Sequence, residues 1–212
     1  MPQFQQVNER MLAITLNGES VYTKRGSMVC YTGKVAFERS FLTGGGIQQL
    51  GMRAVTGEGL VMMKSTGTGT VHYAQHGQFV TLVTLNNEML YVESESLLAF
   101  DQRLQPGTMF IGNQGLQQMV RGAVSGQGLF TTTLQGQGEL ALLSDGPTIA
   151  LQVSADRPVH VDPQAYIGHR GNLSSNIVTD VNWKTFIGQT SGETYQVRFS
   201  GQGTVYIQAS ER

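Results

Sequence analysis

The chain has 212 residues, of which 40% are hydrophobic, so it can bury a full core as one domain or as a few small repeats. Only 14% of the residues are charged, and the formal net charge is −1. Nucleic-acid binding needs clustered Lys and Arg, and the 14 such residues here are scattered, which argues against a nucleic-acid partner. The chain shows no signal peptide and no apolar run of membrane-spanning length, and with a single cysteine it is predicted to be cytoplasmic.

The first predicted strands lie on either side of Asn17-Gly18, a dipeptide typical of a tight turn, and turns are predicted at Asn86-Asn87 and Ala155-Asp156 in the later units. They lead to Cys30, whose apolar neighbours in "GSMVCYTG" predict a buried, inert thiol. Helical periodicity is scarce, and a short turn near 48–53 is the best candidate for a helix. The pattern therefore favours an all-β fold.

An internal repeat organises the rest of the chain. Residues 84–100, "TLNNEMLYVESESLLAF", match residues 15–31, "TLNGESVYTKRGSMVCY", at an offset of 69 residues. The same offset reaches 153–169, where the apolar alternation keeps its phase although few letters match. We therefore predict three β modules with pseudo-threefold symmetry, at residues 1–77, 78–146 and 147–212.

Each predicted module carries a pair of glycines separated by one residue. The pairs are Gly67 with Gly69, Gly136 with Gly138, and Gly201 with Gly203. No helix is predicted after them, which argues against the alternative of a phosphate cradle, because a helix N-terminus would have to complete it. We interpret them as hairpin turns, where the backbone needs a positive φ or a close approach between strands.

The best candidate for a metal site is "HVD", because His160 and Asp162 would share one face of a strand and supply two ligands of a 2-His-1-carboxylate triad. The repeat register argues against it. His160 takes the position of Tyr22 and Tyr91, and His169 takes that of Tyr31 and Phe100. Both histidines are thus interpreted as aromatic substitutes in structural positions, and no metal or other cofactor is expected.

Several segments together resemble a known family. They are "GGGIQQL", "TGEGLVMMKSTGTGTV", "LYVESESLLAF", "SGQGLFTTTLQGQGELAL" and "GETYQVRFSGQGTVYIQASE". The chain resembles, from about Val7 to Glu211, the family named after yeast altered inheritance of mitochondria protein twenty-four. The resemblance implies three tandem modules like the tryptophan-RNA-binding attenuation protein, each a shortened double-stranded β-helix. It brings no catalytic residues.

Apolar loops are the candidate interaction sites. "FLTGGGIQQLGM", "FIGNQGLQQMV" and "NWKTFIG" place apolar side chains at equivalent positions of the three modules. They either plug their own modules or gather on one rim as a contact surface for a sister subunit, another protein or a membrane surface. The residues expected to contribute to association are Ile47, Leu116, Trp183 and Phe186.

Two classes of function stay open. The first is a non-enzymatic scaffold in membrane organisation or stress response, as the family's mitochondrial association implies. The alternative is a small-ligand or metal-binding double-stranded β-helix enzyme. The scaffold is favoured because no catalytic constellation survives the repeat register. Strand edges defended by few charges also predict a homo-oligomer.

Overall fold

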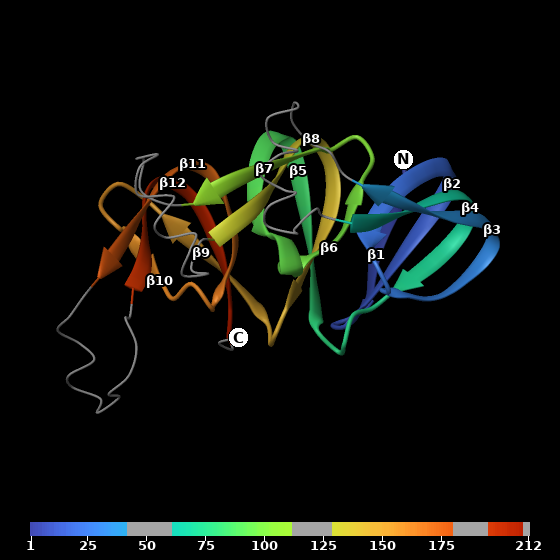
Figure 1. The fold of residues 1–212 in the computed structure, drawn as a ribbon, viewed down its shortest axis with the longest axis horizontal. Coiled ribbons are helices and arrows are strands. Elements are labelled where there is room, and N and C mark those ends of the chain that lie inside the picture. The colour runs from blue at the N-terminus through green and yellow to red at the C-terminus, as the bar shows by residue number, and fades with distance from the viewer. Residues whose placement is uncertain (42–60, 112–128, 180–194, 210–212) are drawn as a thin grey trace.

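The computed structural model describes residues 1–41, 61–111, 129–179 and 195–209 (Figure 1). This part of the chain is built from strands, and a single turn of 3-10 helix, Ser94–Ser96, is its one helical element. The all-β class predicted from the sequence is confirmed. Within these described ranges, no helix is long and apolar enough to cross a membrane.

The strands follow one another in three groups. The first group contains β1 (Gln3–Asn8), β2 (Met11–Lys24), β3 (Met28–Phe41) and β4 (Val61–Tyr73). The second contains β5 (Phe79–Glu93), β6 (Leu97–Asp101), β7 (Gln105–Ile111) and β8 (Leu129–Ser144). The third contains β9 (Thr148–Val153), β10 (Val159–Val161), β11 (Tyr166–Thr179) and β12 (Tyr195–Gln208).

Equivalent strands of the groups follow the repeat found in the sequence. β3 covers residues 28–41 and β11 covers 166–179, a shift of twice the 69-residue offset. In each group the last strand, β4, β8 or β12, pairs antiparallel with strands of its own group on both sides. The predicted module boundaries fall in the turns between groups. The three modules themselves stay a prediction, because neighbouring groups also share one continuous sheet.

The groups lie in a row along the longest axis of the molecule (Figure 1). The strand order of the sheet is β10-β12-β11-β5-β8-β6-β2-β4-β3. Two antiparallel pairings join the groups, β2 with β6 and β5 with β11. β10 and β3 are therefore at opposite ends of the sheet.

Three apolar clusters form the core of the described residues. The middle cluster centres on Leu90, Phe100 and Leu140, and it includes Met62 of the first group and Ile167 of the third. The first group's cluster is shared with the second, and its members include Ile14, Tyr73, Leu98 and Leu143. The third cluster draws only on its own group, among them Tyr166, Phe199 and Val205. Each fully buried side chain of this size stabilises the fold by about 1.5–3 kcal/mol.

The glycine pairs lie inside strands, so the predicted hairpin turns at these positions are wrong. Gly67 and Gly69 are in the middle of β4, opposite Val35 and Gly33 of β3. A Cβ added at Gly67 would collide with the backbone carbonyl oxygen of Lys34, and the φ of Gly67 is +142°. Both the positive φ and the close approach of two backbones were expected, but they serve a bend within paired strands rather than a turn.

The predicted turns at the start of each unit divide into two kinds. Asn17-Gly18 and Asn86-Asn87 lie within β2 and β5, where the strand register shifts and Gly18 and Asn87 have positive φ angles of 95° and 59°. These are β-bulges, which need the same residue types as a tight turn. Ala155-Asp156, by contrast, is a turn closed by a bridge between Ser154 and Arg157.

Candidate interaction site

The first half of β3 presents apolar side chains to solvent. Met28, Val29 and Tyr31 are 37%, 53% and 47% exposed, and Cys30 between them is also exposed. The prediction of a buried Cys30 thiol is therefore wrong. β3 pairs only with β4 among the described strands, so its other edge is unpaired. We call the segment Met28–Tyr31 the open edge.

The same four positions are buried in the other two groups. Their equivalents in the second group are Leu97, Leu98, Ala99 and Phe100, all with no exposed surface. In the third group they are Tyr166, Ile167, Gly168 and His169, which are also buried. The residue types of the open edge match those of a covered strand. The open edge is therefore exposed because of the position of its group in the row.

The pairing of β2 with β6 shows what covers these positions. Tyr22 of β2 lies opposite Phe100 of β6, and their rings stack with centroids 5.2 Å apart. Val21 and Ala99 beside them are buried. Offset aromatic stacking adds about 0.5–1.5 kcal/mol to the burial of the two rings. β2 of the first group therefore covers β6 of the second group.

The pairing of β5 with β11 repeats this arrangement with a histidine. Tyr91 lies opposite His169, and the two rings stack with centroids 4.5 Å apart and an interplanar angle of 3°. The hydroxyl of Tyr166 lies 2.7 Å from Nδ1 of His169. Burial lowers the pKa of His169 to about 4, so at pH 7 the neutral ring can accept a hydrogen bond from this hydroxyl through Nδ1. The prediction that His169 replaces an aromatic ring in a structural position is confirmed.

The other candidate metal residues lie at the far end of the row. His160 is exposed on β10, opposite Arg198 of β12. Asp162 follows the end of β10, and its Oδ1 accepts a hydrogen bond from the backbone N–H of Gln164 at 2.9 Å. In the parts of the chain that the structure describes, no group of three or more His, Cys, Asp and Glu side chains lies close enough to hold a metal ion.

The interaction residues predicted in the apolar loops cannot be placed. Ile47, Leu116, Trp183 and Phe186 all lie outside the described residues. Their contribution to association stays a prediction.

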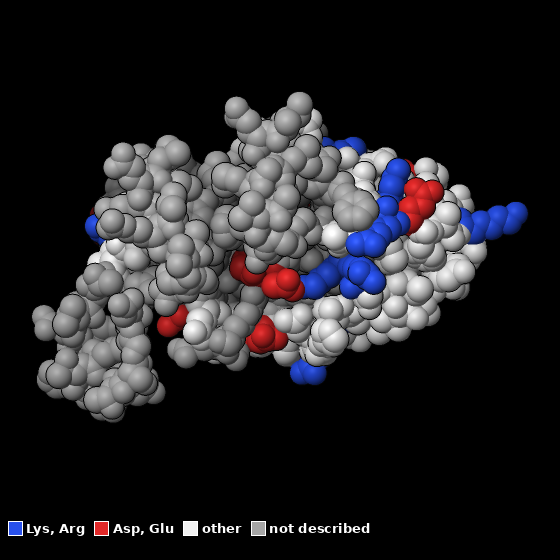
Figure 2. Space-filling model, in the orientation of Figure 1, with Lys and Arg blue, Asp and Glu red and all other residues white. Residues whose placement is uncertain are grey.

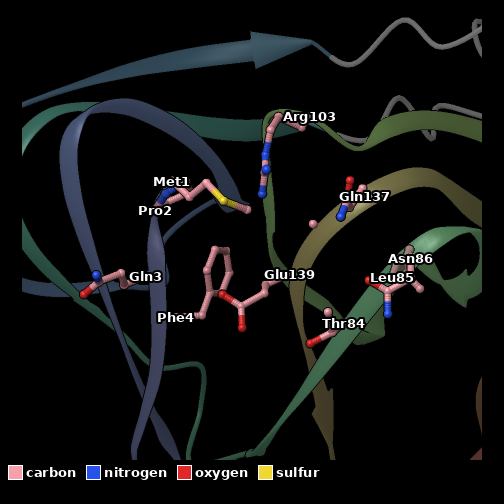
Figure 3. A pocket seen from close by; sticks show the side chains of 11 residues that line it. Met1, Pro2, Gln3, Phe4, Thr84, Leu85, Asn86, Arg103, Gln137 and Glu139 are labelled. Atoms are coloured by element: carbon pink, nitrogen blue, oxygen red, sulfur yellow. The ribbon is translucent and has the colours of Figure 1, made fainter.

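A cleft of about 430 Å³ lies beside the N-terminal strand (Figure 3). Met1 and Phe4 line one side, and Asn86, Arg103 and Glu139 line the other. The guanidinium of Arg103 is held by Asp101, with Nη2 and Nε 2.5 Å and 3.0 Å from Oδ2. This ion pair fixes the turn after β6, because Asp101 also accepts the backbone N–H of Arg103. The arginine therefore has a structural partner already.

On the face drawn in Figure 2, Lys and Arg side chains gather mainly over the first group, and Asp and Glu side chains lie beside them. Lys24 forms an ion pair with Glu95, and the Nζ and Oε2 atoms are 2.6 Å apart. This pair links the end of β2 to the 3-10 turn before β6. Its charges thus support the joint between the first two groups.

The fold and the site define an all-β protein whose strand groups join side by side into one sheet that ends in an apolar open edge. The chain belongs to the family described as mitochondrial biogenesis AIM24, whose sequence pattern matches residues 4–210. The family predicted from the sequence is thereby confirmed.

One solved structure shows the same fold. The chain is similar to the crystal structure of protein SPYM3_0169 from Streptococcus pyogenes, with a TM-score of 0.71 and 23% sequence identity. The match covers 100% of this chain and 94% of that one. A comparison with curated proteins finds no match.

Proposed function

We propose that this protein is a non-enzymatic structural protein that works by assembling with copies of itself. The observation that carries the proposal is the open edge. An unpaired strand with apolar side chains is a template for pairing with another chain, and proteins that stay monomeric blunt such edges with charges or proline. The charges of β3, Lys34, Glu38 and Arg39, all lie beyond the open edge.

A scaffold in membrane organisation or stress response is the role we propose for such an assembly. The family description, mitochondrial biogenesis, supports a role in building a cellular structure. A protein that self-associates through strand edges leaves its outer faces available for a membrane surface or another protein. A cytoplasmic location stays part of this proposal.

The test of self-association compares two matched variants. We expect the wild-type protein to have a mass above the 23.0 kDa of one chain by light scattering after gel filtration. Val29→Arg places a charge in the open edge and should lower the mass to that of one chain, because the charge cannot be buried without a partner. The control is Ile177→Arg, which adds the same charge at a side chain that is 37% exposed.

The control should keep the wild-type mass. Ile177 occupies the repeat position of Arg39, so arginine is already tolerated at that position in the first group. A wild-type mass of 23.0 kDa that does not change with protein concentration would contradict self-assembly. The membrane role is tested separately by co-sedimentation with liposomes, and protein that stays in the supernatant would contradict that part.

A further inference from the structure

The three groups carry three equivalent pairing surfaces of each kind, and the two junctions between groups occupy only two of each. At each internal junction, β2 or its equivalent β5 pairs with the strand of the following group that is equivalent to β3: β2 pairs with β6, and β5 pairs with β11. β3 of the first group, and β10 of the third group, which corresponds to the C-terminal part of β2 and β5, have no such partner in the described chain. These two unused surfaces are therefore the two halves of one more junction of the same kind.

Strand pairing within the groups fixes which residues are equivalent. Tyr22, Tyr91 and His160 lie opposite Lys64, Thr133 and Arg198, which occupy matching positions on β4, β8 and β12. Tyr31, Phe100 and His169 lie opposite Val71, Leu140 and Val205, which also match. The assignment therefore rests on hydrogen-bonded strands as well as on the sequence repeat.

We propose that β10 of one copy pairs antiparallel with the open edge of a second copy, in the register of the internal junctions. His160 then lies opposite Tyr31, as Tyr91 lies opposite His169 and Tyr22 opposite Phe100. Val161 lies opposite Cys30, and Val159 opposite Thr32. This proposal rests on the self-assembly proposed above and names its surface and its partner.

The residues on both sides fit this junction. Met28, Val29 and Tyr31 are exposed in a single chain, while their equivalents in the covered groups are buried. On the other side, Val159 is only partly buried, whereas its equivalents Val21 and Leu90 have no exposed surface. A second copy would cover both sets of side chains and satisfy the free backbone groups of β3 and β10.

The geometry makes the contact heterologous. β3 and β10 are at opposite ends of the row, so one chain cannot pair them with each other in this arrangement (Figure 1). Each copy then contributes its open edge to one neighbour and its β10 to another. Such head-to-tail contacts continue until the rotation between copies closes a ring, or they extend as a filament.

Capping variants test this directly. Tyr31→Glu blocks the open edge but leaves β10 intact, and His160→Glu does the reverse, while the two substituted surfaces repel each other because they carry like charges at facing positions. We expect each variant alone to have the mass of one chain, 23.0 kDa. Mixed in equal amounts, they should form a one-to-one dimer and nothing larger, because the intact β10 of the first pairs with the intact edge of the second. Unchanged thermal unfolding of each variant alone shows that the fold persists.

The outcomes separate this inference from the proposed function. A wild-type protein that is monomeric at all concentrations contradicts both. An assembled wild type whose mass is unchanged by Tyr31→Glu and His160→Glu contradicts only the β3–β10 junction. A mixture that stays monomeric, or that grows beyond a dimer, contradicts the head-to-tail geometry.

A disulfide tests the register. Val161→Cys would face the native Cys30 of the neighbouring copy, and mild oxidation should give covalent oligomers that are lost on reduction. Val161→Cys combined with Cys30→Ser should give none. Gln202→Cys, an exposed position on β12, controls for random collisions. Equal cross-linking by Gln202→Cys and Val161→Cys would overturn the register.

Discussion

Replacing Gly67 by alanine is expected to destabilise the protein by about 3 kcal/mol. Gly67 has a φ of +142°, a conformation that residues with a Cβ rarely adopt, and it lies where β4 approaches β3. An alanine Cβ would meet the backbone carbonyl oxygen of Lys34, so the two strands would have to separate. The free energy of unfolding measured in denaturant checks this expectation.

Gly18→Ala is the matched control. Gly18 also has a positive φ, +95°, but a Cβ there would meet no atom within 4 Å. This variant reports backbone strain alone, and we expect a loss of about 1 kcal/mol. Equal losses for the two variants would show that the close approach of β3 and β4 contributes nothing.

Lowering the pH from 6.5 to 4 is expected to reduce the stability of the protein by about 3 kcal/mol through His169 alone. Its pKa is about 4 in the folded protein because of burial, against 6.5 in an exposed histidine. Between these pH values the unfolded chain binds a proton that the folded chain does not. The contribution of His169 to the free energy of unfolding is therefore fully present above pH 6.5, and it is lost as the pH falls towards 4.

His169→Phe isolates this effect, because Phe100 shows that the position accepts a phenylalanine ring. The variant loses the partner of the Tyr166 hydroxyl, which costs about 1–3 kcal/mol at neutral pH. Its stability should fall less steeply than that of the wild type between pH 6.5 and 4. Identical slopes for the wild type and His169→Phe would contradict the role of burial.

The sequence repeat predicted the strands well, since apolar alternation and the 69-residue offset both reflect which side chains face the core. It also identified His169 as a substitute for a ring, because Phe100 occupies the same position. It predicted hairpin turns at the glycine pairs, which lie within strands, and a tight turn at Asn17-Gly18, which is a β-bulge in β2. A positive φ is needed equally in a hairpin, a bulge and a bent strand, so residue type alone cannot distinguish them.

The open edge was missed for a different reason. Local apolar character predicts burial, and Val29 and Cys30 have the same neighbours as a covered strand would. Whether they are covered depends on a strand from a preceding group, and no group precedes the first one in the row. The repeat itself indicated this exposure, because the first copy of any repeat has no preceding copy to cover it.

The shared side chains of the core divide the chain unequally into cooperative units. The middle group needs Met62 and Ile167 from its neighbours to complete its core, whereas the third group supplies its own cluster around Phe199 and Val205. Local opening of the third group can thus leave that cluster intact, but it removes Ile167 from the middle cluster, which also contains Phe100 and Leu140. Amide hydrogens of β5 and β8 should therefore exchange at a rate set by the opening of a terminal group, not by events in the middle group itself.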